Sequence, residues 1–131
     1  MKNIICNYYD TKQNQTVESY PDLVTAIATF REFEWRPVVN DEGEAGIQMI
    51  MYNAVGDNNS SMQLSNSEDK LWCLAVCAVN RRRFCGPFFA KQTFKLFVEI
   101  EQSIVEKWIR NYFNDSLEEF TKRLEATAEH L

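Results

Sequence analysis

The chain has 131 residues, a length at which one hydrophobic core is expected, so residues 1–131 are interpreted as a single globular domain. Apolar residues make up 45% of the chain and charged residues 25%, proportions that exclude disordered, collagenous and membrane-spanning chains. Nineteen acidic and fourteen basic side chains give a formal charge of -5, which opposes binding to a nucleic-acid backbone and favours a basic partner.

The N-terminal segment predicts a strand. Residues 2–9 contain a β-branched and aromatic cluster, followed by a polar stretch over 10–16. Only three consecutive apolar residues follow Lys2, fewer than the roughly 7 to 15 of a signal-peptide core. No apolar run approaches the roughly 20 residues that span a bilayer. We therefore expect a cytoplasmic protein without membrane contact.

A helix and a hairpin follow in the predicted order. Ser19 and Asp22 have the spacing of a capping box, and apolar residues then recur at helical intervals, which predicts a helix over about 20–33. Pro37 discourages helix before it, and residues 40–44 form a polar turn that contains a glycine. A β-hairpin is predicted around this turn.

Alternating patterns predict the next strands. Ile47, Met49 and Met51 alternate with Gln48, Ile50 and Tyr52, the period of two of a strand with one face on the core. After a loop over 56–61, Met62 and Leu64 alternate with polar neighbours in a short strand. A polar turn over 66–69 separates this short strand from segment 71–79, which is apolar at every position. That composition predicts a strand in the middle of the sheet, covered on both faces.

The C-terminal third predicts one strand and two helices. Residues 91–101 fit both a strand and a helix, but Ser103 and Glu106 resemble a capping box, so a strand is placed before Ser103 and a helix after it. Ser116 and Glu119 repeat the pattern before a final helix. The expected fold is α+β: an antiparallel sheet of five or six strands with one early helix and two C-terminal helices.

Four cysteines and one histidine raise the possibility of a metal site. Cys73 and Cys77 are separated by three residues, so the C-x2-C pattern of zinc knuckles is missing, and His130 is next to the last residue. On a strand the two cysteines share one face, where they fit as small buried hydrophobes; a metal or redox role is the alternative. Free thiols are expected, also at Cys6 and Cys85, with no cofactor.

Catalytic patterns are missing. A cysteine nucleophile would need a nearby base, which the single histidine does not provide. Glu99 and Glu101 form a carboxylate pair, as do Glu118 and Glu119, but the second pair opens a helix and suits its dipole. Neither a phosphate-binding glycine loop nor a G-x-S-x-G elbow occurs. The sequence predicts that the protein is not an enzyme.

One basic segment runs from Arg81 to Arg83, with Lys91 and Lys95 after it and aromatic residues nearby. Such a segment can bind nucleic acid, but in an acidic chain it more often forms internal salt bridges. Acidic side chains concentrate in the predicted turns and loops, where they are either simply solvated or form a surface that meets a basic protein. The residues proposed for that surface are Asp41, Glu42, Glu44, Asp57, Glu68 and Asp69.

In outline, the chain resembles the small immunity proteins of bacterial polymorphic toxin and contact-dependent inhibition systems, which bind and neutralise a co-encoded toxin domain. The resemblance rests on the short acidic chain, on the apolar segment 71–79, and on the closing patterns 105–109 and 116–120. It implies that the protein acts by occlusion, with a preformed surface that covers the active site of the toxin. No functional residue follows from it.

A small adaptor or regulatory ligand-binding domain is the alternative function. Its sheet and helices would enclose a pocket lined by Met49, Met51, Trp72 or Trp108, although core packing explains these residues equally well. An apolar cavity would favour this alternative, whereas a flat acidic face would favour an immunity protein. An enzyme that used Cys85 would need a second polar group within hydrogen-bond reach.

Overall fold

The computed structural model describes the backbone of residues 3–10, 15–35, 38–39, 45–46, 48–55, 59–68, 70–81 and 90–127. Within these ranges, the side chains of residues 38–39, 45–46, 55, 59, 68, 80–81 and 90–91 are left undescribed.

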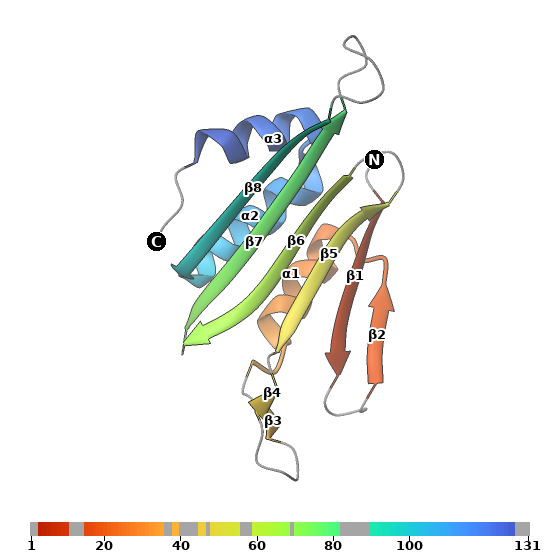
Figure 1. Ribbon diagram of the computed structural model, residues 1–131. Coiled ribbons are helices and arrows are strands. Elements are labelled where there is room, and N and C mark those ends of the chain that lie inside the picture. The colour runs from red at the N-terminus through yellow and green to blue at the C-terminus, as the bar shows by residue number, and fades with distance from the viewer. Residues whose placement is uncertain are drawn as a thin grey trace.

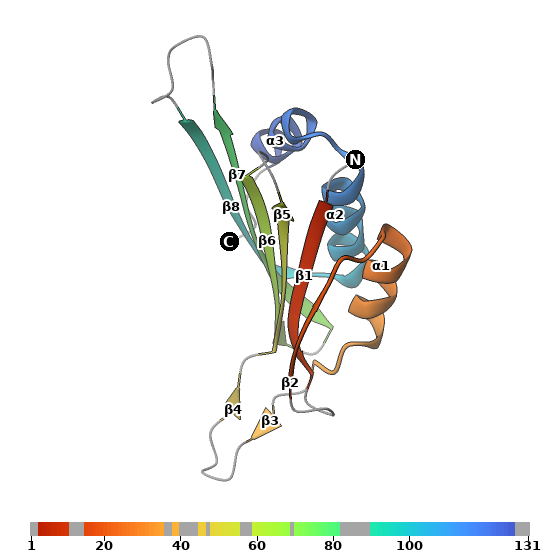
Figure 2. The same cartoon turned by 90° about the vertical axis from the view of Figure 1, so that its right-hand side faces the viewer.

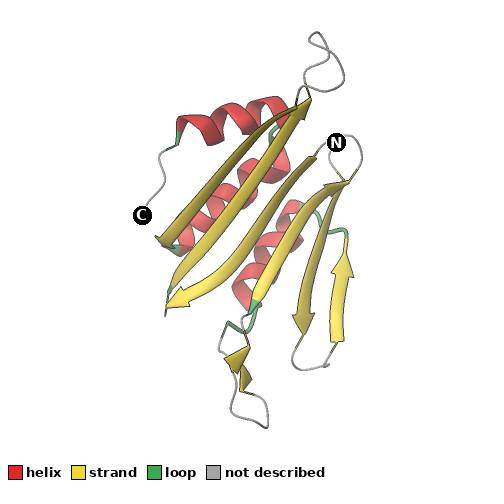
Figure 3. Ribbon diagram, in the orientation of Figure 1, coloured by secondary structure: helices red, strands yellow, loops and turns green. Residues whose placement is uncertain are grey.

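A six-stranded antiparallel sheet with the strand order β2-β1-β5-β6-β7-β8 forms the centre of the structure (Figures 1 and 3). One helix lies early in the chain and two helices close its described part, which confirms the predicted α+β class. The elements are β1 (Asn3–Asp10), β2 (Gln15–Ser19), α1 (Leu23–Glu32), β3 (Val38–Val39), β4 (Ala45–Gly46), β5 (Met49–Val55), β6 (Asn59–Glu68), β7 (Leu71–Arg81), β8 (Ala90–Ile100), α2 (Gln102–Asn114) and α3 (Leu117–Ala126).

All three described helices pack against the same face of the sheet (Figure 2). Alternate side chains of the strands point into this layer because successive residues of a strand face opposite sides. Aromatic rings fill much of the core, and the rings of Phe97 and Trp108 stack with their centroids 5.1 Å apart. Since each fully buried large apolar side chain contributes about 1.5–3 kcal/mol, this layer is the main source of stability.

The opposite face of the sheet is open within the described part of the chain (Figure 2). On β7, Leu74 and Val76 are buried beneath the helices, while Cys73, Ala75 and Cys77 are partly exposed on the open face. The expectation that segment 71–79 is covered on both faces is therefore wrong. β7 is an interior strand, between β6 and β8, and its neighbours shelter these small side chains enough for an apolar composition.

Residues 91–100 are a strand, as predicted, and they pair with β7. The register shifts between the pairs Trp72–Ile100 and Leu74–Phe97, and Glu99 has a positive φ of 53° in this irregular stretch. The irregularity lets Phe97 and Ile100, three residues apart, both face the helices, where both are buried. This spacing explains why the sequence pattern also suited a helix.

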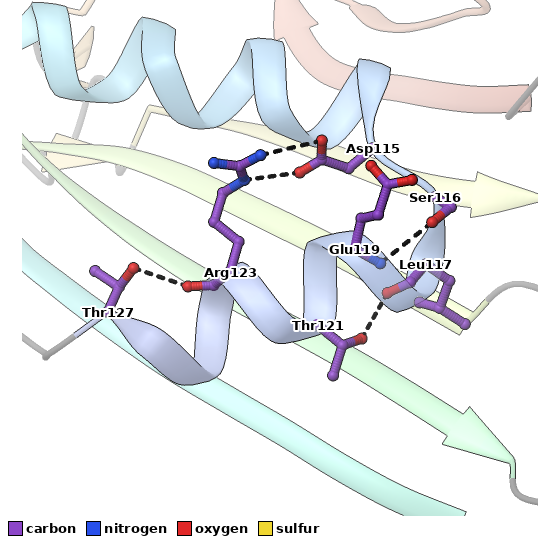
Figure 4. Close-up of polar contacts among 7 residues, drawn as sticks. All are labelled: Asp115, Ser116, Leu117, Glu119, Thr121, Arg123 and Thr127. Carbon is purple, nitrogen blue, oxygen red and sulfur yellow. Dashed lines mark hydrogen bonds and ion pairs between the residues drawn. The ribbon is translucent and has the colours of Figure 1, made fainter.

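The helix starts follow the capping predictions in one case of three. The N-cap of α1 is Asp22, which accepts a 2.7 Å hydrogen bond from the backbone of Thr25, while Ser19 still belongs to β2. Ser103 lies inside α2, whose N-cap makes no side-chain hydrogen bond. Only Ser116 caps as predicted, accepting from the backbone N–H of Glu119 at 3.2 Å (Figure 4).

Several strand predictions differ from the structure in extent. β2 forms in a segment for which no strand was predicted, and β6 runs from Asn59 to Glu68, through part of the predicted loop over 56–61 and most of the turn over 66–69. The reason is that strands are held together by hydrogen bonds between backbone groups, which depend little on side-chain polarity. Polar residues next to a paired segment therefore pair as well. The predicted hairpin is confirmed as β3 and β4, which form a separate two-stranded sheet.

A charged network joins α1 to α2. Glu106 of α2 has a side chain only 6% exposed, and it accepts hydrogen bonds from Arg31 of α1 at 2.6 and 3.3 Å. Gln102 donates to the same carboxylate at 2.8 Å, and Arg110 lies 3.5 Å away. These contacts lower the pKa of Glu106. The hydrogen bonds from Arg31 have the largest effect, and the hydrogen bond from Gln102 and the charges of Arg31 and Arg110 lower it further.

Candidate functional site

A pocket of about 190 Å³ lies where the end of β1 meets the end of α1. Three segments that are distant in sequence build its wall: the last residues of β1, the final turn of α1 with the two residues after it, and the residue that precedes β5. The lining residues are Tyr8, Tyr9, Asp10, Thr29, Glu32, Phe33, Glu34 and Gln48.

Buried apolar residues fix the two main walls of this pocket, which we call the acidic pocket. Ile4 and Cys6 anchor β1 in the core, and Ile27 and Phe30 do the same for α1. The helix ends at Glu32 because the backbone of the next residue is extended, which turns the chain back toward the sheet. The ends of β1 and α1 are thereby held side by side.

Aromatic rings form a fixed side of the pocket. The ring of Phe33 meets the ring of Tyr8 edge to face, with centroids 5.5 Å apart, and packs against Trp35 with centroids 4.4 Å apart. The indole N–H of Trp35 donates to the backbone carbonyl of Phe30 at 3.2 Å. These contacts hold the rings in place before any ligand arrives.

The electrostatic character of the pocket is negative. Asp10, Glu32 and Glu34 contribute three carboxyl groups, and none of the eight lining residues is basic. The C-terminal end of α1 adds the partial negative charge of a helix terminus. The pKa of Tyr8 is raised, first by burial and then by the neighbouring Cys6 and Asp10. A cation is the ligand that this field favours.

Gln48 supplies a neutral polar group to the same pocket. The residue is only 9% exposed, and its side-chain amide makes no hydrogen bond within the described part of the chain. Because this residue lines the pocket, a ligand that enters can donate a hydrogen bond to its amide oxygen. Gln48 is therefore available to a hydrogen-bond donor that enters the pocket.

The residues predicted from sequence to bind a partner are not brought together by anything the structure describes. Asp41, Glu42, Glu44, Asp57 and Asp69 lie outside the described residues, and Glu68 is described only as the last backbone position of β6. Their role stays a prediction. His130, Cys85 and Arg82 to Phe89 also lie outside the described residues.

Of the residues named for the ligand pocket of the alternative function, Met49, Met51, Trp72 and Trp108, the structure places Trp108 in the lining of a cavity. Met51 is 40% exposed on the open face of the sheet, whereas Trp72 and Trp108 are in the core on the other side. Trp108 does line a different cavity of about 320 Å³ between β8 and the two C-terminal helices, together with Phe97, Ile104, Lys107, Asn111, Arg123, Ala126 and Thr127. Arg123 is held there by an ion pair with Asp115, with the two atoms 2.9 Å apart (Figure 4).

The described cysteines are free thiols, as predicted. Cys6 is buried, and burial raises the pKa of its thiol to about 11. Cys73 and Cys77 share one face, but that face is the open one, so the prediction that they are buried is wrong. The apolar run around them gave no sign of which face the helices cover.

Sequence reasoning missed the acidic pocket. Its signal was the mixture of aromatic and acidic residues in two short stretches, 8–10 and 32–34. The first stretch was read only as the end of a strand and the second as the end of a helix. Nothing in the sequence showed that α1 folds back so that these two ends meet.

The described residues contain no group of three or more histidine, cysteine, aspartate and glutamate side chains placed to hold a metal ion. The longest described helix, α2, has 13 residues, and none of the described helices has the length and apolar character of a membrane span. In comparisons with known proteins, no family model, no curated protein and no solved structure matches this chain.

Proposed function

We propose that this protein is an immunity protein that binds a basic toxin domain and neutralises it by covering the active site of the toxin. The observation that carries the proposal is the acidic pocket, which combines three carboxyl groups, a helix C-terminus and fixed aromatic rings on a chain of charge -5. This combination suits a basic side chain of a protein partner. No chemical step by the immunity protein itself is needed.

The two parts of such binding have different physical origins. The negative charge of the whole chain speeds the encounter with a basic partner, and this effect weakens as salt is added. The affinity depends mainly on a few buried anchors surrounded by contacts that exclude water. A stable complex of the usual kind buries about 1,200–2,000 Å² in total, enough to cover an active site.

The experiment is to purify the chain with the product of the neighbouring gene and to measure complex formation by size exclusion and calorimetry. We expect a 1:1 complex, loss of toxin activity at one equivalent, and an association rate that falls at least tenfold between about 50 and 300 mM salt. A mixture that elutes as two separate proteins would contradict the proposal, as would a complex in which the toxin stays fully active.

The cavity near Trp108 favours a second candidate function, that of a regulatory domain that binds a small ligand. This cavity of about 320 Å³ is lined by both apolar rings and polar groups, which is typical of small-molecule sites. Saturable quenching of tryptophan fluorescence by a small-molecule library member, reduced in Ile104→Arg, would support it. Uniform lack of quenching across the library would count against it.

A further inference from the structure

We propose that the acidic pocket binds the side chain of one arginine presented by the protein partner. This inference rests on the proposed function for the identity of the partner, but the pocket can be tested without that partner. It concerns which cation the pocket selects, and three observations bear on the choice: the aromatic wall, the distribution of acceptors, and the buried amide.

The aromatic wall favours an organic cation over a metal ion. Tyr8, Tyr9 and Phe33 all line the pocket, and the edge-to-face contact between Tyr8 and Phe33 fixes two of these rings. Aromatic rings attract ammonium and guanidinium groups, whereas metal ions such as Mg²⁺ and Ca²⁺ prefer a shell of oxygen atoms alone. A guanidinium group also stacks on rings and is less strongly hydrated than an ammonium group.

The acceptors of the pocket come from different elements. Asp10 ends β1, Glu32 ends α1, Glu34 follows α1, and Gln48 precedes β5. A compact ammonium group, with three donors on one atom, satisfies acceptors that surround a single point. A guanidinium group carries five N–H donors in a planar fork and can reach acceptors that approach from several directions. Because the acceptors of the pocket come from different elements, they suit a guanidinium group better than an ammonium group.

The depth of the pocket separates its charged and neutral acceptors. Glu32 and Glu34 are exposed, and Tyr9 is 44% exposed, so these residues lie at the mouth. Gln48, at 9% exposed, is the most buried of the lining residues. Exposed carboxylates draw a cation in, and the amide oxygen of the more buried Gln48 can accept a hydrogen bond from a long side chain.

The test uses capped tripeptides Gly-Arg-Gly, Gly-Lys-Gly and Gly-citrulline-Gly as probes, titrated into the ¹⁵N-labelled full chain and followed by NMR. We expect saturable shifts of the backbone amides of 8–10 and 32–34 with the arginine peptide, at a dissociation constant on the order of 1 mM. The lysine peptide should bind at least threefold more weakly. The citrulline peptide, which keeps the shape but not the charge, should not saturate.

Two variants locate the site without disturbing the fold. Gln48→Leu removes an amide that has no partner among the described residues, and Glu32→Gln changes an exposed side chain. Each should weaken binding of the arginine peptide by about threefold to tenfold. Glu118→Gln is the matched control, because Glu118 is 73% exposed on α3 and its loss changes the net charge equally. It should leave the affinity within twofold of the wild type.

Equal binding of the arginine and lysine peptides would overturn the inference. Equal weakening of binding by Glu32→Gln and Glu118→Gln would overturn it too. Either result would indicate that the peptide is attracted by net charge alone. The proposed function is judged separately. If the neighbouring gene product binds Gln48→Leu and the wild type equally, the pocket inference fails while immunity stands. If the arginine peptide binds as expected but that product does not bind, the inference survives and immunity fails.

Discussion

Two buried tyrosines of the core, Tyr52 and Tyr112, differ in what their hydroxyl groups contact. The hydroxyl of Tyr112 donates to the backbone carbonyl of Ser60 at 3.0 Å and accepts from the Ser60 side chain at 3.3 Å. The hydroxyl of Tyr52 is buried without a hydrogen-bond partner among the described residues. Burial raises the pKa of both, to about 12 in Tyr112, so both stay protonated at neutral pH.

Removing the two hydroxyl groups should therefore have different effects on stability. Tyr112→Phe loses two hydrogen bonds and should lower the free energy of unfolding by about 1 kcal/mol. Tyr52→Phe removes an unpaired polar group and should leave that free energy unchanged or raise it. Urea unfolding monitored by circular dichroism measures both variants, each serving as the control for the other. Equal destabilisation would show that the Tyr52 hydroxyl has a partner.

The reactivity of the described cysteine thiols also depends on burial. Cys6 is 1% exposed and has a pKa raised to about 11, whereas Cys73 and Cys77 lie on the open face of the sheet. In the folded protein, iodoacetamide should label Cys73 and Cys77 at least tenfold faster than Cys6, because the thiolate is the reacting form and must be accessible. Mass spectrometry of the labelled peptides measures this. Comparable rates in the native state would contradict the packing of β1.

At the scale of elements, the contact between α1 and α2 depends on the charge of Glu106. Its pKa is lowered in the folded protein by the hydrogen bonds from Arg31 and then Gln102. A group with a lowered pKa contributes stability above its unfolded pKa of about 4.3, and this contribution is lost as the pH falls through the folded value. The contribution is therefore fully present at pH 7.

We expect Glu106→Gln to lower the free energy of unfolding at pH 7 by about 1–2 kcal/mol, since charged hydrogen bonds are exchanged for neutral ones and the partner Arg31 is 55% exposed. The difference between variant and wild type should shrink as the pH falls below about 4.3. Denaturation series at pH 7, 5, 4 and 3 measure it. A difference that is independent of pH would show that the effect comes from packing and not from charge.

The order of the elements could be predicted from sequence more accurately than their ends. Periodic apolar residues predicted all three described helices and most strands of the main sheet. Helix starts were less certain, because Ser103 matched a capping pattern that the structure uses only at Ser116. β2 was missed because its residues are mostly exposed and show no alternation of apolar and polar residues. It is a strand because its backbone pairs with β1.

The candidate site could not be predicted, for a reason that concerns the whole molecule. Residues 8–10 and 32–34 meet because α1 lies on the helix-covered face of the sheet (Figure 2) and its end lies next to the end of β1, a contact between segments distant in sequence. Single-sequence patterns report local structure and the face that is buried, but not which ends of different elements coincide. The open face of β7 was misjudged for the same reason, since only the packed molecule shows that all described helices lie on one side.

The stability of the molecule should be uneven across the sheet. β7 is paired on both sides and packs against α2 and α3, whereas β2 is an edge strand with mostly exposed side chains. Amide hydrogens of β7 should exchange slowest and those of β2 at least a hundredfold faster, because edge strands open locally without unfolding of the core. Hydrogen exchange followed by mass spectrometry measures both strands. Equal protection would mean that the sheet opens only as one unit.

The strand order also sets a sequence of events during synthesis. β5, β6 and β7 each pair with the strand that follows in the chain, so these four strands, β5 to β8, can pair in the order in which they are synthesised. β1 is synthesised first, but its neighbour toward the middle of the sheet is β5. Tyr8 can therefore pair with Ile50 only after Ile50 has left the ribosome. Until then β1 can pair only with β2, and a nascent chain halted before residue 50 would expose the apolar side of this hairpin to chaperones.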